Sequence, residues 1–381
     1  MTEPATLTID QVDLPQLDAL AIGAAFLGTG GGGDPYLGGL LAASAIKRHG
    51  PVAVQPLHTL EDQAFAVPVA MMGTPSVMIE KFPGEDELDA AAAAIERRHG
   101  RGASHLMAAE MGGVNAMVPL IVAARRGLPV VDADGMGRAF PELQMVTFNV
   151  YGVPASPLAL TNETGEQVLI EAEDSRQTEM LARSVIVALG GACAISCYAM
   201  SGAQARAASV PGTLSLAHAI GAAILDGRRQ GDPFGALFQC LAHSPYYQHY
   251  ADLIEARVAD VDRRIQGGWT QGACRLEGYG ADRGRTLELV FRNEFLIARE
   301  GGVTRVVVPD LLTVLDAQTA EPITTDGLKY GQRVRVVAAS AAACMRTPAA
   351  LAVFGPARFG FDEPFVALER RPDHVTRGVQ A

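Results

Sequence analysis

Cysteine and aromatic residues are scarce in this sequence of 381 residues. It has 5 Cys and 1 Trp, and Phe, Trp and Tyr together make up 6% of it. So few cysteines in so long a chain exclude the disulfide framework that stabilises small secreted domains. The sequence also lacks an N-terminal basic stretch followed by an apolar core, which a signal peptide requires. We therefore expect a cytoplasmic protein.

Basic residues are fewer than acidic residues. The chain has 31 Lys and Arg against 42 Asp and Glu, a net charge of -11, and no run of five basic residues. Proteins that bind DNA or RNA need a basic surface to neutralise phosphates, so this composition argues against nucleic acid as a partner. Apolar runs are interrupted by glycine or polar residues before they reach the length of a membrane span. We expect neither nucleic acid nor membrane as a partner.

Apolar residues and glycine are abundant instead. Hydrophobic residues make up 49% of the chain, which also has 41 Gly, and its length predicts two domains. In the first part of the chain, strands and helices alternate, which predicts βαβ units and a partly parallel sheet. The expected helices cover 13–27, 35–47, 86–99 and 115–127, and the expected strands cover 51–57, 65–73, 104–113 and a short segment from 128.

The pattern changes after Tyr151. Residues 156–174 have the alternation and turn residues of antiparallel strands, helices are expected over 175–189 and 212–227, and the chain is rich in strands from Arg285. We predict an α/β fold, α+β overall, with two domains. An N-terminal α/β domain covers 1–160 and a C-terminal β-rich domain covers 161–381, with the boundary between 155 and 170.

Residues 28–33, GTGGGG, match the dinucleotide-binding pattern G-x-G-x-x-G. The pattern binds a dinucleotide where a strand precedes it and an acidic residue ends the next strand about 20 positions later. Here a predicted helix precedes the glycines, and Glu61 and Asp62 come after the next strand has ended. No Gly-Lys-Ser/Thr follows, so the phosphate-binding loop of nucleotide hydrolases is not matched either. We expect no dinucleotide cofactor.

Two interpretations of the glycine run remain. It is either a tight connection between two helices, or a loop whose backbone N–H groups bind an anion or a carbonyl oxygen ahead of a helix. Asp34 and Pro35 are typical of such a helix start. The run holds more glycine than a turn requires, which favours the second interpretation. The residues expected to bind substrate there are Gly30, Gly31, Gly32, Gly33 and Asp34.

Asp132 and Asp134 mark the end of a short apolar strand. The carboxyl ends of parallel strands carry the ligand sites of α/β folds, and a two-residue spacing places both side chains on one face. Arg138 and Glu142 follow, and they share a helix face if a helical turn begins at Gly137. The alternative is a charged loop in which Arg138 pairs with Glu142 or Asp134. We predict catalytic roles for Asp132 and Asp134, and substrate binding for Arg138 and Glu142.

Glu80 and Glu110 each end an apolar segment, and Asn115 follows the second. An acid at such a position is costly to bury without a partner or a chemical role, so each is either a salt-bridged strand end or a catalytic carboxylate. Together with the aspartates they would line a pocket that activates water or holds a hard divalent metal ion. We predict catalytic roles for Glu80 and Glu110 and substrate binding for Asn115. Whether a metal is used stays open.

Motifs of zinc enzymes and serine hydrolases are missing. None of the 8 His residues is part of an H-x-E or H-E-x-x-H pattern, and no G-x-S-x-G occurs. Cys193 and Cys197 have three residues between them and no second pair to complete a tetrahedral site. We expect both cysteines in the hydrophobic core.

Three blocks resemble a bacterial family whose genes often accompany hydantoinase/oxoprolinase genes, with one branch named for S-methyl-thiohydantoin desulfurase. The blocks are FLGTGGGGDPYLG (26–38), EMGGVNAMVPLIVAARRGLPVVDADGMGRAFPELQM (110–145) and RVVVPDLLTVLD (305–316). The likeness covers nearly the whole chain. It implies a cytoplasmic protein with an N-terminal α/β domain, which carries the first two blocks, and a β-rich C-terminal domain.

The resemblance implies a hydrolase that acts on a small cyclic amide or imide, a hydantoin or S-methyl-thiohydantoin type ring, through water activated by a carboxylate or a metal ion. Beside it, the residues suggest Asp132 or Asp134 as base or metal ligand, Arg138 as anchor for substrate charge, and glycine N–H groups on the ring oxygens. The alternative is a non-catalytic partner subunit or ligand-binding component of a hydantoinase/oxoprolinase system. A homo-oligomer and a hydantoinase-type partner are both compatible with the sequence.

Overall fold

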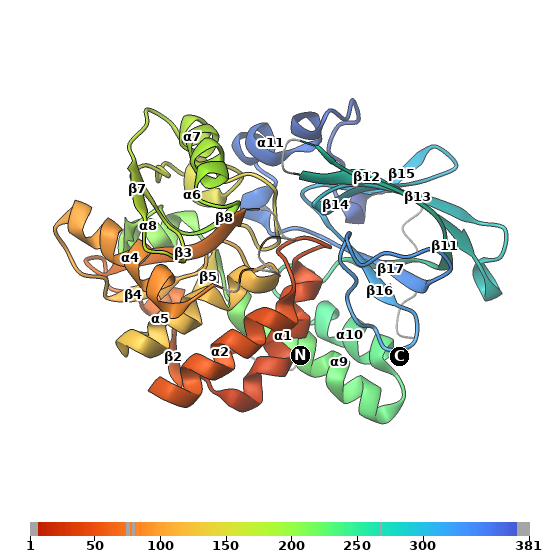
Figure 1. Cartoon of the computed structure of the whole chain (residues 1–381). Helices are drawn as coiled ribbons and strands as arrows, with labels where there is room; N and C mark the ends of the chain where they lie inside the picture. Colours follow the sequence, from red (N-terminus) through yellow and green to blue (C-terminus); the bar gives the residue numbers. More distant parts are fainter. Residues whose placement is uncertain (1–6, 74–76, 78–80, 82, 267–268, 372–381) are drawn as a thin grey trace.

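A computed structural model describes residues 7–73, 77, 81, 83–266 and 269–371. It contains a mixed β-sheet and an antiparallel β-sheet, with most of the helices packed around the mixed sheet (Figure 1). None of the described helices is long and apolar enough to cross a membrane. Glu80, one of the predicted catalytic residues, lies outside the described residues.

The mixed sheet contains the predicted parallel strands. β3 (Phe65–Gly73), β4 (His105–Met107) and β5 (Val130–Asp134) are parallel, and α4 (Glu85–His99) and α5 (Val118–Arg126) connect them. This succession confirms the predicted βαβ units. The order across the sheet is β1 (Gln11–Val12), β2 (Val52–Pro56), β5, β4, β3, β8 (Ala192–Ser196), β6 (Leu158–Thr161) and β7 (Gln167–Ile170). Two short strands join it at other places: β9 (Met200–Ser201) pairs with β3, and β10 (Val210–Pro211) pairs with β5.

Charges and glycines at the helix ends account for these helices. The first turn of α4 is acidic and its last turn is basic, which suits the helix dipole at both ends. α4 ends at Gly100 and α5 at Gly127, both in the left-handed conformation that glycine adopts without strain. The residues at the helix ends were therefore sufficient to predict where these helices end.

α1 (Leu14–Leu27) and α2 (Pro35–His49) lie on either side of the glycine loop, which we define as Gly28–Gly33. Asp34 caps α2 by accepting a hydrogen bond from the Tyr36 N–H, and Pro35 takes the first helical position, as predicted. α1 packs closely against α9 (Thr213–Gln230) (Figure 1). A Cβ on Gly23 of α1 would lie 1.6 Å from the Ala217 carbonyl oxygen of α9, so glycine permits this contact.

The antiparallel sheet confirms the β-rich C-terminal domain. Strands β13 (Thr286–Arg292) and β14 (Glu294–Glu300) are joined by a turn at Asn293, whose φ of 58° is a left-handed value that asparagine tolerates. The order of its strands is β15 (Val303–Val307), β14 (Glu294–Glu300), β13 (Thr286–Arg292), β12 (Trp269–Gly278), β11 (Tyr250–Gln266), β17 (Arg333–Ala339) and β16 (Leu311–Asp316). The remaining described α-helices are α6 (Thr147–Val150), α7 (Ser175–Ala188), α8 (Gly202–Ala208), α10 (Pro233–Ala242) and α11 (Pro348–Phe354).

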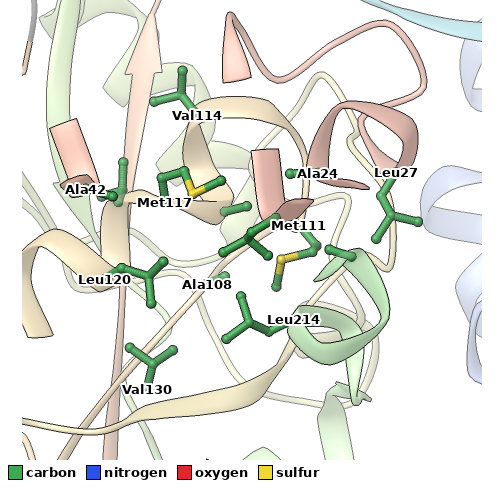
Figure 2. Close-up of a cluster of buried hydrophobic side chains, with 14 of the residues drawn as sticks. Ala24, Leu27, Ala42, Ala108, Met111, Val114, Met117, Leu120, Val130 and Leu214 are labelled. Carbon is green, nitrogen blue, oxygen red and sulfur yellow. The ribbon is translucent and has the colours of Figure 1, made fainter. Parts of the chain in front are cut away.

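A hydrophobic core fixes the base of the glycine loop. Leu27, the last residue of α1, is buried together with Met111 and Val114 from the segment after β4, and with Leu214 of α9 (Figure 2). The glycine loop therefore begins directly after a buried helix end. Cys193 and Cys197 are buried in a second apolar cluster, as expected.

Two local predictions need correction. The strand predicted over 104–113 ends at Met107, and the chain then forms a loop and the 3₁₀-helix η2 (Gly113–Ala116). The helical turn considered from Gly137 does not form, because residues 135–138 bend instead. The predicted domain division at 160/161 falls inside β6, and β8, β9 and β10 from beyond it join the mixed sheet; the division itself stays a prediction.

Candidate functional site between the two sheets

A pocket of about 610 Å³ is lined by residues of both domains. The mixed-sheet domain contributes the glycine loop, the end of β3, the loop after β4 and the loop after β5. The C-terminal domain contributes the β13–β14 turn and the segment 321–329. The predicted site residues on its walls are Gly30, Gly31, Gly32, Gly33, Asp34, Glu110, Asn115 and Glu142.

Glu110 lies in the loop after β4, at the carboxyl end of the parallel strands, where α/β folds place their sites. Asn115 of η2 donates a hydrogen bond from Nδ2 to Oε1 of Glu110 at 2.6 Å. The same side chain is bonded to Met71 of β3: its Oδ1 accepts from the N–H at 2.7 Å and its Nδ2 donates to the C=O at 3.1 Å. The backbone of β3 thus sets the orientation of the Asn115 amide.

The environment of Glu110 makes its carboxyl a proton acceptor near neutral pH. Burial raises the pKa of Glu110 from its usual range to about 7, the hydrogen bond from Asn115 opposes that rise, and the nearby Asp134 carboxyl adds to it. A carboxyl with a pKa near the working pH is the preferred general base or acid. Of the predicted catalytic residues that the structure describes, Glu110 alone lines the pocket.

The glycine loop owes its composition to close approach on two sides. A Cβ on Gly31 would lie 2.1 Å from Oε1 of Glu294, and a Cβ on Gly32 would lie 2.6 Å from the carbonyl carbon of Gly112. Gly30, Gly32 and Gly33 also have positive φ angles of 90°, 79° and 79°. Within the described chain, the N–H groups of Gly32 and Gly33 form no hydrogen bond. The close packing supports the interpretation of the glycine run as a tight connection between helices. The free N–H groups support the interpretation as a loop that binds an anion or a carbonyl oxygen.

Asp132 stabilises α9 and does not line the pocket. Its Oδ1 accepts hydrogen bonds from the N–H groups of Leu214 and Ser215 at 2.9 and 3.0 Å, and its Oδ2 accepts from the Ser215 hydroxyl at 2.6 Å. These N–H groups belong to the first turn of α9, whose N-cap residue, Gly212, has no side chain to cap it. Asp132 supplies the cap from β5, 82 residues away in sequence.

Asp134 is fully buried and accepts hydrogen bonds from the N–H groups of Met136 and Gly137. It therefore holds the turn after β5. Burial raises its pKa to about 7 against these hydrogen bonds. Asp134 does not line the pocket, and it acts on the site through its charge beside Glu110.

Arg138 requires a correction, because it has no N–H group left for a substrate. The side chain is completely buried and lies outside the pocket lining. A guanidinium has five N–H donors, and all five are used here. They are donated to the carbonyl oxygens of Ala139, Pro309, Asp310 and Phe295 and to Oγ1 of Thr29. Arg138 therefore joins the glycine loop to the C-terminal domain.

Glu142 lines the pocket but does not form the pair with Arg138 that the sequence suggested. It accepts a hydrogen bond from Arg292 of β13 at 2.9 Å, and another from Gln144. Arg138 donates its N–H groups to other oxygens and pairs with neither Glu142 nor Asp134. Glu142 instead pairs with Arg292 of the C-terminal domain. Asp34 lines the pocket from the start of α2.

Sequence analysis missed Glu294, the first residue of β14. It lines the pocket, and only 2% of its surface is exposed. The signal was available: an acid begins the apolar stretch FLIA, and the same argument singled out Glu80 and Glu110. No pattern linked Glu294 to the N-terminal blocks, because the contact between them is long-range.

No group of three or more His, Cys, Asp or Glu side chains within the described ranges is arranged to hold a metal ion. The carboxylates of Asp132 and Asp134 are instead occupied by backbone N–H groups and a hydroxyl. Whether the protein uses a metal is tested by assays with EDTA and with added divalent metals.

Comparisons with known proteins identify the family. A family model described as "S-Me-THD-like, N-terminal domain" matches residues 15–172, and one described as "S-Me-THD-like, C-terminal domain" matches 173–368. An X-ray crystal structure of a protein from Chromobacterium violaceum is similar over 94% of this chain and 99% of its own, with 26% sequence identity and a TM-score of 0.78. No curated protein matches the chain. The chain belongs to the S-Me-THD-like family, which is named after a desulfurase activity on S-methyl-thiohydantoin.

Proposed function

We propose that this protein hydrolyses a small cyclic amide or imide of the hydantoin or S-methyl-thiohydantoin type, with Glu110 as the base that activates water. The observation that carries the proposal is the placement of Glu110: a buried carboxyl, held by Asn115 on the wall of a pocket, with a pKa of about 7. The family's name supplies the substrate class.

The pocket suits such a ring. Its volume of about 610 Å³ is in the range of small-molecule sites, about 300–1,000 Å³. Apolar side chains, among them Met71, Met136 and Phe140, line it beside the carboxyls, so a flat ring can bind by its faces. The free N–H groups of Gly32 and Gly33 are suited to the ring carbonyl oxygens.

The reaction needs no oxidant or reductant. In an S-methyl-thiohydantoin, the ring carbon that carries sulfur has a double bond to one ring nitrogen. Glu110 takes a proton from water while the water oxygen bonds to that carbon, and the C=N electron pair moves to the nitrogen. When the pair returns, the C–S bond breaks and the sulfur leaves with a proton as methanethiol. The ring keeps the oxygen and becomes a hydantoin after a proton shift.

The experiment is a substrate panel with the purified chain. Hydantoins, thiohydantoins and S-methyl-thiohydantoins with different ring substituents are incubated with and without EDTA and added divalent metals, and thiol release and ring products are measured. We expect methanethiol from an S-methyl substrate, and a loss of roughly 10²–10⁴-fold in kcat for Glu110→Gln. The matched control is Glu288→Gln, on an exposed glutamate of β13, with unchanged kcat.

The same panel tests the alternative of a non-catalytic subunit. A non-catalytic component would show no turnover alone with any ring, and turnover only after a hydantoinase-type partner is added. Turnover by Glu110→Gln at the wild-type rate would contradict the role of Glu110 while leaving the substrate class standing.

A further inference from the structure

Glu294 faces the same pocket as Glu110 but comes from the other domain. It is the first residue of β14, directly after the tight turn at Asn293, so the position of its backbone is fixed by the antiparallel sheet. Glu110 is close enough for its charge to raise the pKa of Glu294. The two carboxyls therefore line one pocket, each from a different domain.

One oxygen of Glu294 has no protein partner. Oε2 is buried and accepts or donates no hydrogen bond in the described structure. A buried acid without a partner is costly in free energy, so such a group requires an explanation. Because Glu294 lines the pocket, a ligand bound there is the candidate for the missing partner.

Arg138, one of two basic groups near Glu294, does not hydrogen-bond to it. Arg138 contributes a positive charge nearby, but all its N–H groups are donated to neutral oxygens. Burial raises the pKa of Glu294 well above its usual range, and the Glu110 charge adds to that rise. The charges of Arg138 and Arg292 oppose it. Burial and the Glu110 charge thus favour the protonated form of Glu294.

The glycine loop makes room for this side chain. A Cβ on Gly31 would lie 2.1 Å from Oε1 of Glu294 and 2.6 Å from its carboxyl carbon. Any larger residue at position 31 would displace the carboxyl. The N-terminal domain thus provides a space for an acid that the C-terminal domain supplies.

We propose that Glu294 is the proton donor of the reaction, protonating the leaving group from the C-terminal domain while Glu110 deprotonates water from the N-terminal domain. This inference rests on the proposed function. As the C–S bond breaks and its electron pair stays on sulfur, the Glu294 O–H proton moves to the sulfur and methanethiol leaves. Glu294 is then a carboxylate and Glu110 is protonated, and transfer of that proton from Glu110 to Glu294 restores both. Two carboxyls with different proton affinities are the usual arrangement for paired base and acid catalysis.

The test compares two leaving groups. An S-methyl substrate loses a basic thiolate that needs a proton, whereas an S-aryl analogue with an electron-withdrawing nitro group loses a stable thiolate that needs none. Wild type, Glu294→Gln, Glu294→Asp and the control Glu288→Gln are assayed with both. We expect Glu294→Gln to lose roughly 10²–10³-fold in kcat on the S-methyl substrate, and less than about tenfold on the S-aryl analogue. Glu294→Asp should keep part of the S-methyl activity.

Three outcomes would overturn the inference. Equal losses on both substrates would mean that Glu294 supports the structure without donating a proton. Unchanged kcat on the S-methyl substrate would also contradict it. Absence of thiol release by the wild type from either substrate would instead show that the proposed function is wrong, and the inference with it.

Discussion

The side-chain amide of Asn115 connects the Met71 backbone to the carboxyl of Glu110, with a hydrogen bond of 2.6 Å from Nδ2 to Oε1. Because Oδ1 of Asn115 accepts from the Met71 N–H, its NH₂ group must face Glu110. A donor in this position stabilises the charged form of the carboxyl. Asn115 is therefore a positioning residue that also keeps Glu110 from binding its proton too tightly.

Replacement of Asn115 by alanine should move the pH dependence of the reaction. Without the Nδ2 donor, the pKa of Glu110 rises above about 7, so the fraction of active carboxylate at pH 7 falls. We expect the rising limb of kcat/KM against pH to shift to higher pH in Asn115→Ala, with partial recovery of the rate in alkaline buffer. A uniform loss at every pH would show that Asn115 only supports the fold.

Gly31→Ala should reduce activity more than stability. The new Cβ meets the end of the Glu294 side chain, which can rotate away, so the fold survives while the carboxyl leaves its place. We expect a melting temperature close to that of the wild type and a loss of S-methyl turnover comparable to that of Glu294→Gln. Thermal unfolding and kcat are measured together.

Gly39→Ala is the matched control for Gly31→Ala. Gly39 lies within α2, and a Cβ there would have only the Ala21 Cβ within 4 Å, at 3.8 Å. We expect unchanged kcat and a gain of roughly 0.5–1 kcal/mol in the free energy of unfolding. Full activity in Gly31→Ala would contradict the assignment of a chemical role to Glu294.

Asp132→Ala should lower stability through α9. Three hydrogen bonds to the first turn of that helix are lost, and Gly212 cannot replace them. We expect a loss of about 2 kcal/mol in the free energy of unfolding, and a smaller loss for Asp132→Asn, which keeps one acceptor oxygen. In both variants kcat at low temperature should stay within a few-fold of the wild type. A catalytic loss as large as that of Glu110→Gln would restore Asp132 to the active site.

Sequence patterns were sufficient for the elements whose signals are local. The capped start of α2 at Asp34, the strand Phe65–Gly73 and the helix ends at Gly100 and Gly127 follow from residues within one turn of each feature. The position of Glu110 at a strand end was also predictable, because parallel strands bring their carboxyl ends together.

The roles of Asp132, Arg138 and Glu294 depend on partners far away in sequence. Asp132 contacts a helix 82 residues later, and the donor–acceptor contacts of Arg138 with Phe295 and Asp310 span 157 and 172 residues. Charged residues near a strand end look alike in sequence whether they serve a substrate or a distant backbone. The fold alone distinguishes the two, because it shows which N–H and C=O groups already satisfy them.

The role of Glu110 as base is tested by the pH dependence of kcat/KM in wild type and Glu110→Gln. If Glu110 is the base, the wild-type kcat/KM rises with pH through about 7, because the carboxyl accepts a proton from water only after it has lost its own. We expect this rise in the wild type and in Glu288→Gln, and its absence from the residual activity of Glu110→Gln. The same rise in Glu110→Gln, or a wild-type kcat/KM that does not change between pH 5 and 9, would contradict this role.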